Sequence, residues 1–276
     1  MKLYENPVLH RELFMRFRLR QMPLGVKIGI VLGIILSLGT VYWQIFVNLS
    51  ASNDPNYGKT AWFICIAIQY VILCLVAPIV TANTITQEKE QQTWEMLISS
   101  RLDPLEIIFG KLIARLVMPF LVIALFAPIT IFCWAHAAVN TVETSLQATV
   151  PDLILAYAVL LLTTLLFSTV GMFMSWHSKR TLFAVMLSYT FNIMGLLIIT
   201  AIVTLMLATR FTDSSFYLHC PLMWINPAFL MIEALTNADG SNGHLFVVYG
   251  LICYVMMILL MLWRMALGFR RFSHDD

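Results

Sequence analysis

Formal charge is scarce in this sequence. Only 12% of its 276 residues are Asp, Glu, Lys or Arg, whereas 60% are hydrophobic, and the mean hydropathy is +0.83. A soluble domain carries about 25% charged residues, because polar surface keeps it in water. The composition therefore excludes a soluble enzyme and a disordered or fibrous chain, and it predicts an integral membrane protein. The net charge of +2 is too small to indicate nucleic-acid binding.

Motifs that carry chemistry are also missing. The five cysteines include no C-x-x-C pair, so neither a disulfide scaffold nor a zinc knot is supported. H-E-x-x-H is absent, and the upstream glycine of a phosphate-binding loop is missing before Gly110-Lys111. His219, Cys220 and His244 lack the spacing of a metal site. We therefore expect no catalytic residue, no metal and no cofactor on this chain.

Six apolar runs are long enough to cross a bilayer, which takes about 20 residues of helix. A seventh run, 214–232, contains Pro221 and Pro227, which would break a spanning helix, so we expect it to be re-entrant or interfacial. The prediction is an all-α integral membrane protein with six transmembrane helices in a single domain, 1–276. The six runs, all free of Asp, Glu, Lys and Arg, are 28–53, 60–87, 116–142, 153–178, 181–209 and 240–263.

The basic residues predict the orientation. Fifteen of the seventeen fall before the first span, between spans two and three, between spans four and five, or after span six. Only Lys59 and Arg210 fall on the other side. Because Lys and Arg collect in the cytoplasm, we expect a multi-pass protein of the cell (inner) membrane with both termini cytoplasmic. The long basic lead and the long first run predict a retained anchor and no cleaved signal peptide.

Segments at both faces carry helix start signals. Asn6-Pro7 is typical of a helix beginning, and the basic helix it starts in residues 1–23 is predicted to lie along the inner membrane surface, or else to be a topology anchor only. On the other face, Asn226-Pro227 in the extracytoplasmic segment 210–244 predicts a short helix to Thr236.

Inside the runs, polar chemistry is sparse. Apart from Cys and Tyr, the ionisable residues there are His136, His177 and His244, and all three lie near the ends of their runs. Transport driven by an ion gradient usually needs a buried ionisable group near the midplane, so its absence argues against that class. Gly25, Gly29 and Gly33 would let another helix approach closely, either within the chain or at the seam of a dimer.

The connection between spans two and three is highly charged. Residues 83–115 carry five acidic and four basic side chains, so this stretch is either a solvated loop or a surface that faces a protein. Asp103, Pro104 and Glu106 predict the start of a helix that continues into span three, and 93–98 can form a short helix before it. We expect a helical elbow beneath the membrane, with 83–112 as its core.

A family resemblance lies in this elbow. Residues 85–97, followed by Gly110-Lys111-Leu112, resemble the cytoplasmic segment of export-class (type 2) ATP-binding-cassette permeases, and residues 6–13 resemble the start of such chains. Trp94 and Arg101-Leu102 depart from the usual pattern. The resemblance implies a permease without ATPase activity, paired with an identical or different permease chain, and docked through the elbow onto cytoplasmic ABC ATPase subunits that bind ATP-Mg.

The resemblance also implies which residues couple the permease to the ATPase. The first three of these residues would lie at the membrane-proximal turn, and the others nearer the ATPase groove. They are Glu88, Glu90, Thr93, Glu95, Leu97, Ser99 and Ser100.

Two other classes stay open on the residues alone. A membrane anchor or scaffold could recruit a cytoplasmic complex without moving anything. A polytopic membrane enzyme is less well supported, because it would need clustered His, Asp, Glu or Cys at one face, and the elbow pairs its acids with bases.

Overall fold

A computed structural model shows the fold. It describes residues 57–93, 104–140, 149–208, 226–236 and 241–272, together with Gly39, Tyr42, Trp43 and Val47. These residues form helices and turns, with no strand among them, which confirms the all-α prediction.

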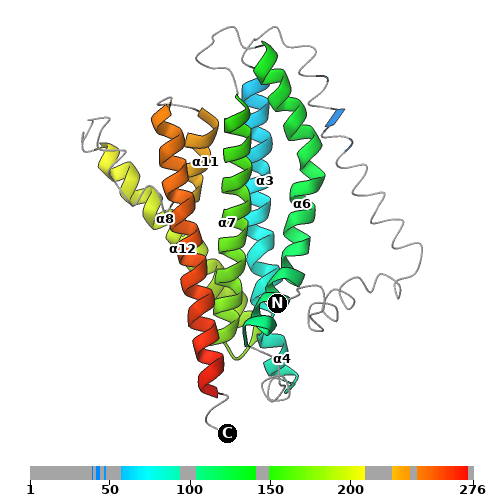
Figure 1. Cartoon of the computed structure of the whole chain (residues 1–276), viewed down its shortest axis with the longest axis vertical. Helices are drawn as coiled ribbons and strands as arrows, with labels where there is room; N and C mark the ends of the chain where they lie inside the picture. Colours follow the sequence, from blue (N-terminus) through cyan, green and yellow to red (C-terminus); the bar gives the residue numbers. More distant parts are fainter. Residues whose placement is uncertain are drawn as a thin grey trace.

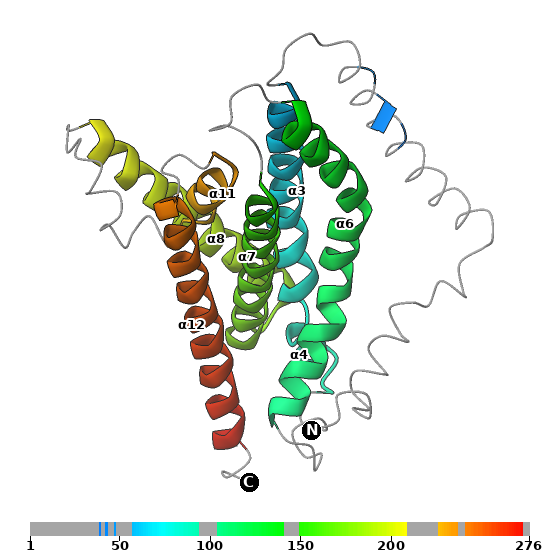
Figure 2. The ribbon, with the colours of Figure 1, turned by 45° about the horizontal axis from the view of Figure 1, so that its top comes forward.

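Four helices stand side by side along the long axis of the molecule (Figure 1). All four are long and apolar enough to cross a membrane, and they correspond to predicted runs two, three, four and six. Run five is also helical over 28 residues, as α8 (Thr181–Ala208), which lies obliquely to the others (Figure 2). Run 28–53 and the helix expected in 1–23 lie outside the described ranges. The four upright helices are α3 (Tyr57–Ala82), α6 (Pro104–Asn140), α7 (Val150–His177) and α12 (Ser241–Phe272).

Two short helices lie at opposite ends of the bundle (Figure 1). α11 (Pro227–Thr236) packs against α7 and α12, and the Oδ1 of Asn226 accepts the backbone N–H of Ala228 at 3.0 Å. The predicted start and end of this helix are therefore confirmed. α4 (Thr86–Glu90) lies at the other end, beneath α3 and α6.

Some predicted helix boundaries are wrong. α3 ends at Ala82, five residues before the end of its apolar run, and α4 follows after a turn. α12 continues nine residues past Trp263, where the run without charged residues ends. The helix continues because the next residues, such as Arg264 and Met265, are good helix formers even though some are charged. α6 runs unbroken from Pro104 through Pro119 and Pro128, so the predicted helix start at Pro104 and the third apolar run belong to one helix. The predicted cap Asp103 and residues 94–98 lie outside the described part of the chain.

α3 and α7 pack closely and run in the same direction, since both begin at the end where α11 lies and descend to the elbow (Figure 1). Near their lower ends, Gly171 of α7 faces α3 so closely that an added Cβ would collide with the Thr81 hydroxyl. That Cβ would also lie 3.2 Å from the carbonyl oxygen of Pro78. The pairing of Gly171 with Thr81 therefore aligns the two helices as they reach the elbow.

Candidate functional site

The turn that leaves α3 is tied to α6. The Thr84 hydroxyl donates to the carbonyl oxygen of Thr81 at 2.5 Å, one of the carbonyls that the end of a helix leaves without an intrahelical partner. The guanidinium of Arg115, on α6, donates to the Oδ1 of Asn83 at 3.0 Å. Thr84 is buried. The end of α3 is thus held to the helix that returns from the elbow.

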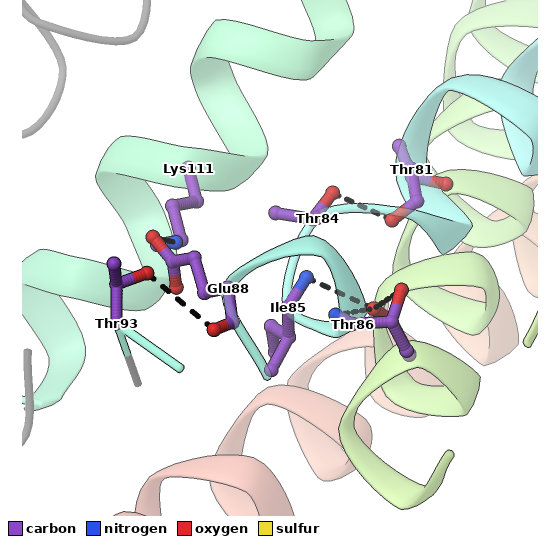
Figure 3. A network of polar contacts seen from close by, with 8 residues as sticks. Thr81, Thr84, Ile85, Thr86, Glu88, Thr93 and Lys111 are labelled. Carbon is purple, nitrogen blue, oxygen red and sulfur yellow. Dashed lines mark hydrogen bonds and ion pairs between the residues drawn. The ribbon is translucent and has the colours of Figure 1, made fainter. Parts of the chain in front are cut away.

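The start of α4 is held by α7. The Ser175 hydroxyl oxygen accepts hydrogen bonds from the backbone N–H groups of Ile85 and Thr86, both at 2.9 Å (dashed lines from Ile85 and Thr86 in Figure 3). These are N–H groups that the first turn of a helix cannot satisfy internally. A five-residue helix is too short to persist alone, because one turn gains few hydrogen bonds for the dihedral angles it orders. Ser175 therefore supplies from another helix what α4 lacks.

Lys89 binds the end of α7. Its ammonium donates to the backbone carbonyl oxygens of Trp176 and, at 3.1 Å, of Ser178, and it lies 5.8 Å from the centre of the Trp176 ring. The last carbonyls of a helix carry partial negative charge, so a cation there is favoured. Partial burial lowers the pKa of Lys89 from its usual range.

Glu90 binds the start of α8. Its carboxylate accepts the backbone N–H of Thr181 at 2.7 Å, where the positive end of the helix dipole favours an anion. This hydrogen bond is the main reason that the pKa of Glu90 lies below its usual value, and Arg180 adds to the effect. Lys89 and Glu90, neighbours in α4, thus bind the end of α7 and the start of α8, each opposite in charge to the helix end it meets.

Glu88 binds α6. Its carboxylate forms an ion pair with the ammonium of Lys111, and Figure 3 shows the two side chains pointing toward each other. The Lys111 side chain is 1% exposed and that of Glu88 is 22% exposed. Burying an ammonium without a counter-charge costs free energy, so the Glu88 carboxylate is needed for Lys111 to be buried.

The chain leaves α4 through a left-handed residue. Gln92 has φ 57°, and the N–H of Thr93 donates to the carbonyl oxygen of Glu88 at 3.0 Å, while the N–H of Gln92 donates to that of Lys89 at 3.3 Å. These two bonds form a Schellman cap, in which glycine usually occupies the position of Gln92. The cap turns the chain sharply away from α4 at Thr93.

Of the predicted coupling residues, three are described. Glu88 and Glu90 make contacts within the chain, to α6 and α8, and Thr93 is an exposed residue of the cap, whose hydroxyl donates to the Glu88 carbonyl oxygen at 3.4 Å. Glu95, Leu97, Ser99 and Ser100 lie outside the described ranges, so their predicted role stays a prediction.

The residues of α7 and α8 that bind α4 were not predicted from the sequence. Ser175, Trp176 and Ser178 at the end of α7, and Thr181 at the start of α8, contact α4 chiefly through backbone groups or a single hydroxyl. The available signal was the polar interruption Ser178-Lys179-Arg180 between two apolar runs, which marks a helix break but not its partner.

Among the described residues, no three His, Cys, Asp or Glu side chains gather in a group that could hold a metal. Glu88 and Glu90 of the elbow face a basic side chain and a backbone N–H, so these two acids hold helices together. The fold and the elbow define the class of protein: a multi-pass helical membrane protein in which a charged connection, containing α4, binds three helices, α6, α7 and α8.

The family follows from comparison with known proteins. The chain belongs to the ABC-2 family of transporter proteins, whose family model matches residues 19–276. It is therefore a membrane-embedded permease component of an ATP-binding-cassette transport system, as the elbow predicted. No curated protein matches the chain.

Proposed function

We propose that this chain is the permease subunit of an ATP-driven exporter, that it works as a pair of permease chains, and that separate cytoplasmic ATPase subunits dock on its elbow. ATP-Mg is bound and hydrolysed on those subunits, and this chain supplies no catalytic residue. The family supports the permease component, and the elbow supports the coupling.

The observation that carries the proposal is the way in which α4 is attached. Three consecutive residues reach three different helices: Glu88 binds α6, Lys89 binds α7 and Glu90 binds α8. A displacement of α4 would therefore act on all three helices together. Closure of an ATPase dimer could use this connection to shift the bundle between two packed states, without any charge buried in the spans.

The charge distribution supports a cytoplasmic elbow. Lys59 lies in the first turn of α3, at the end of the bundle opposite the elbow. Five basic residues lie toward the elbow end, in α4, α6 and α12 or in the break between α7 and α8: Lys89, Lys111, Arg115, Arg180 and Arg264. The side richer in Lys and Arg faces the cytoplasm in membrane proteins. With α12 ending on that side, the C-terminus would be cytoplasmic in the cell membrane.

Purification of the tagged chain from its native membrane in mild detergent tests whether an ATPase is bound to it. A stoichiometric ATPase with Walker motifs is expected. A photo-crosslinking residue at Glu95 or Ser99 should attach to that ATPase, whereas the same residue at Lys59 should not. A chain that purifies alone, or with a complex that has no ATPase, would exclude the transporter function and favour the membrane anchor.

A double variant tests whether α4 couples the ATPase to the helices of the permease. Because Glu88 and Glu90 bind within the chain, Glu88→Ala with Glu90→Ala should leave membrane insertion and ATPase co-purification intact. In the reconstituted complex it should abolish the response of ATP hydrolysis to the permease. The matched control is Gln87→Ala with Gln91→Ala, which removes two exposed side chains, one in α4 and one directly after it. ATPase coupling that is unchanged in the Glu88/Glu90 variant would contradict the assignment.

A further inference from the structure

A cavity of about 260 Å³ opens at the elbow end of the bundle, between the last turns of α7 and α12. It lies beside the break between α7 and α8, where Lys89 and Glu90 of α4 bind. Its volume is close to the lower bound of small-ligand pockets, about 300 Å³. The residues that line it are Phe173, Trp176, His177, Arg264, Leu267 and Gly268.

Aromatic rings form one wall of the cavity. Trp176 packs against Gly268, where an added Cβ would lie 2.7 Å from the Trp176 Cζ2 atom, so the glycine makes room for the indole. The rings of Phe173 and His177 lie 4.6 Å apart, centre to centre. The His177 Nδ1 is 3.2 Å from the Phe173 carbonyl oxygen, which can only accept, so Nδ1 carries the hydrogen and Nε2 is left for another partner.

The cavity carries positive charge. The Arg264 side chain lines it and is exposed, and it makes no hydrogen bond or ion pair with the described residues. Lys179 and Arg180, two and three residues after His177, are also exposed. The carboxylate of Glu90, in α4, is already engaged with the N–H of Thr181. A guanidinium without a described partner at the mouth of a cavity favours an anion, and guanidinium geometry suits phosphate.

An apolar surface leads away from the cavity along α12. Met256, Leu259, Leu260 and Trp263 are all more than half exposed, and they precede Arg264 on the same membrane-spanning helix. A tryptophan followed by an arginine at the end of an apolar span is typical of the boundary between hydrocarbon and headgroups. A ligand with a phosphate at the cavity and acyl chains on this surface would match both features.

We propose that the cavity binds the headgroup of an anionic phospholipid from the leaflet at the elbow end, with its phosphate on Arg264 and its acyl chains along α12. Basic pockets between membrane helices on the cytoplasmic side recognise such headgroups. The site depends neither on the transported substrate nor on the ATPase.

The lipid would share a residue with the elbow. Trp176 forms a wall of the cavity, and its carbonyl oxygen accepts the ammonium of Lys89. An occupied cavity would hold the last turn of α7 in the position that binds α4. Lipid binding should therefore protect the amides of α4 from hydrogen exchange.

Native mass spectrometry of the delipidated full-length chain tests the proposal. With phosphatidylglycerol added, the wild-type chain should retain one lipid more tightly than it retains phosphatidylcholine. Arg264→Gln should weaken phosphatidylglycerol binding about tenfold or more, the effect of losing one charge-assisted hydrogen bond. Arg264→Lys should keep most of the affinity, and Lys59→Gln, at the other end of the bundle, should keep all of it.

Three results would overturn the proposal. Equal retention of phosphatidylcholine and phosphatidylglycerol would exclude headgroup recognition, and this comparison needs only the wild-type chain. Unchanged binding in the folded Arg264→Gln variant would exclude the cavity. Displacement of phosphatidylglycerol by glycerol 3-phosphate at equal concentration would show that a soluble phosphate, and not a lipid, is the ligand.

Discussion

Lys89 and Glu90 are adjacent in the chain, yet their side chains bind different helices: Lys89 holds the last carbonyls of α7 and Glu90 holds the first N–H of α8. Each charge meets the helix end of opposite polarity. The order Lys-Glu therefore matches the order in which α7 ends and α8 begins. Exchanging the two residues would place each charge against a helix end of its own sign.

Acid should loosen the contact between α4 and α8. The pKa of Glu90 is lower in the folded protein than its ordinary value of 4.5, because the charged form accepts the Thr181 N–H. The contact is therefore complete above about pH 4.5 and is lost as the pH falls through the lowered pKa. The protection factor of the Thr181 amide should decrease over this range.

Glu90→Gln is the control for that titration. The amide keeps an acceptor oxygen but does not ionise, so protection at Thr181 should be weaker at neutral pH and should not change with acid. An acid-induced loss of the same size in Glu90→Gln would assign the effect to another group.

Removing Glu88 should destabilise the protein through Lys111. Glu88→Leu leaves a nearly fully buried ammonium without its counter-charge, and we expect a loss of about 2–3 kcal/mol, somewhat below the range for fully buried pairs because Glu88 is partly exposed. Adding Lys111→Met should restore most of the stability. Thermal unfolding of both variants in the same detergent measures the coupling. A single variant as stable as the wild type would show that the ion pair does not support the packing.

Loss of the Ser175 hydroxyl should unfold α4 locally. Ser175→Ala leaves the N–H groups of Ile85 and Thr86 without an acceptor, at a cost of about 1–3 kcal/mol. Hydrogen exchange should rise in residues 85–90 while the spans stay protected. Ser168→Ala is the matched control, because Ser168 is equally buried on α7 and its hydroxyl has no hydrogen bond among the described residues. Equal exchange in both variants would contradict the role of Ser175.

Adding one methyl group at Gly171 should separate α3 from α7. Gly171→Ala collides with Thr81, and we expect a loss of about 1–3 kcal/mol from overpacking. Gly195→Ala, in α8, meets no atom within 4 Å and should be neutral or stabilising by up to about 1 kcal/mol. The Tm of each variant in detergent makes the comparison, and a Gly171 variant with the Tm of the Gly195 variant would exclude a close contact.

Local signals predicted what depends on local sequence. Asn226-Pro227 predicted the start of α11, and Pro104 predicted where α6 begins, because caps and prolines act within one turn. α4 was not predicted, because the acceptor for its first N–H groups is Ser175, which is 89 residues distant from Thr86 along the chain. Hydrophobicity predicted the four helices that are long and apolar enough to span a membrane, but not where they end, since α12 continues well beyond its apolar run.

The candidate site could be predicted only in part for a related reason. The charges of the elbow were visible in the sequence, and Lys111 belonged to the motif that resembles the permease family. Their partners were not visible, because Lys89 and Glu90 bind backbone atoms of α7 and α8, and a backbone carbonyl or N–H has no residue-specific signal. Only the packing of the helices brings these groups together.

The contact at Gly171 also limits how the bundle can move. With the backbones of α3 and α7 in close approach beside Pro78, neither helix can slide along the other without driving larger side chains into the space that only glycine leaves. We expect tilting about this crossing to be less restricted than sliding, because Pro78 at the same level weakens the resistance of α3 to bending. Since the crossing lies near the α4 end of α3, a small tilt imposed there would move the far end of α3 further sideways.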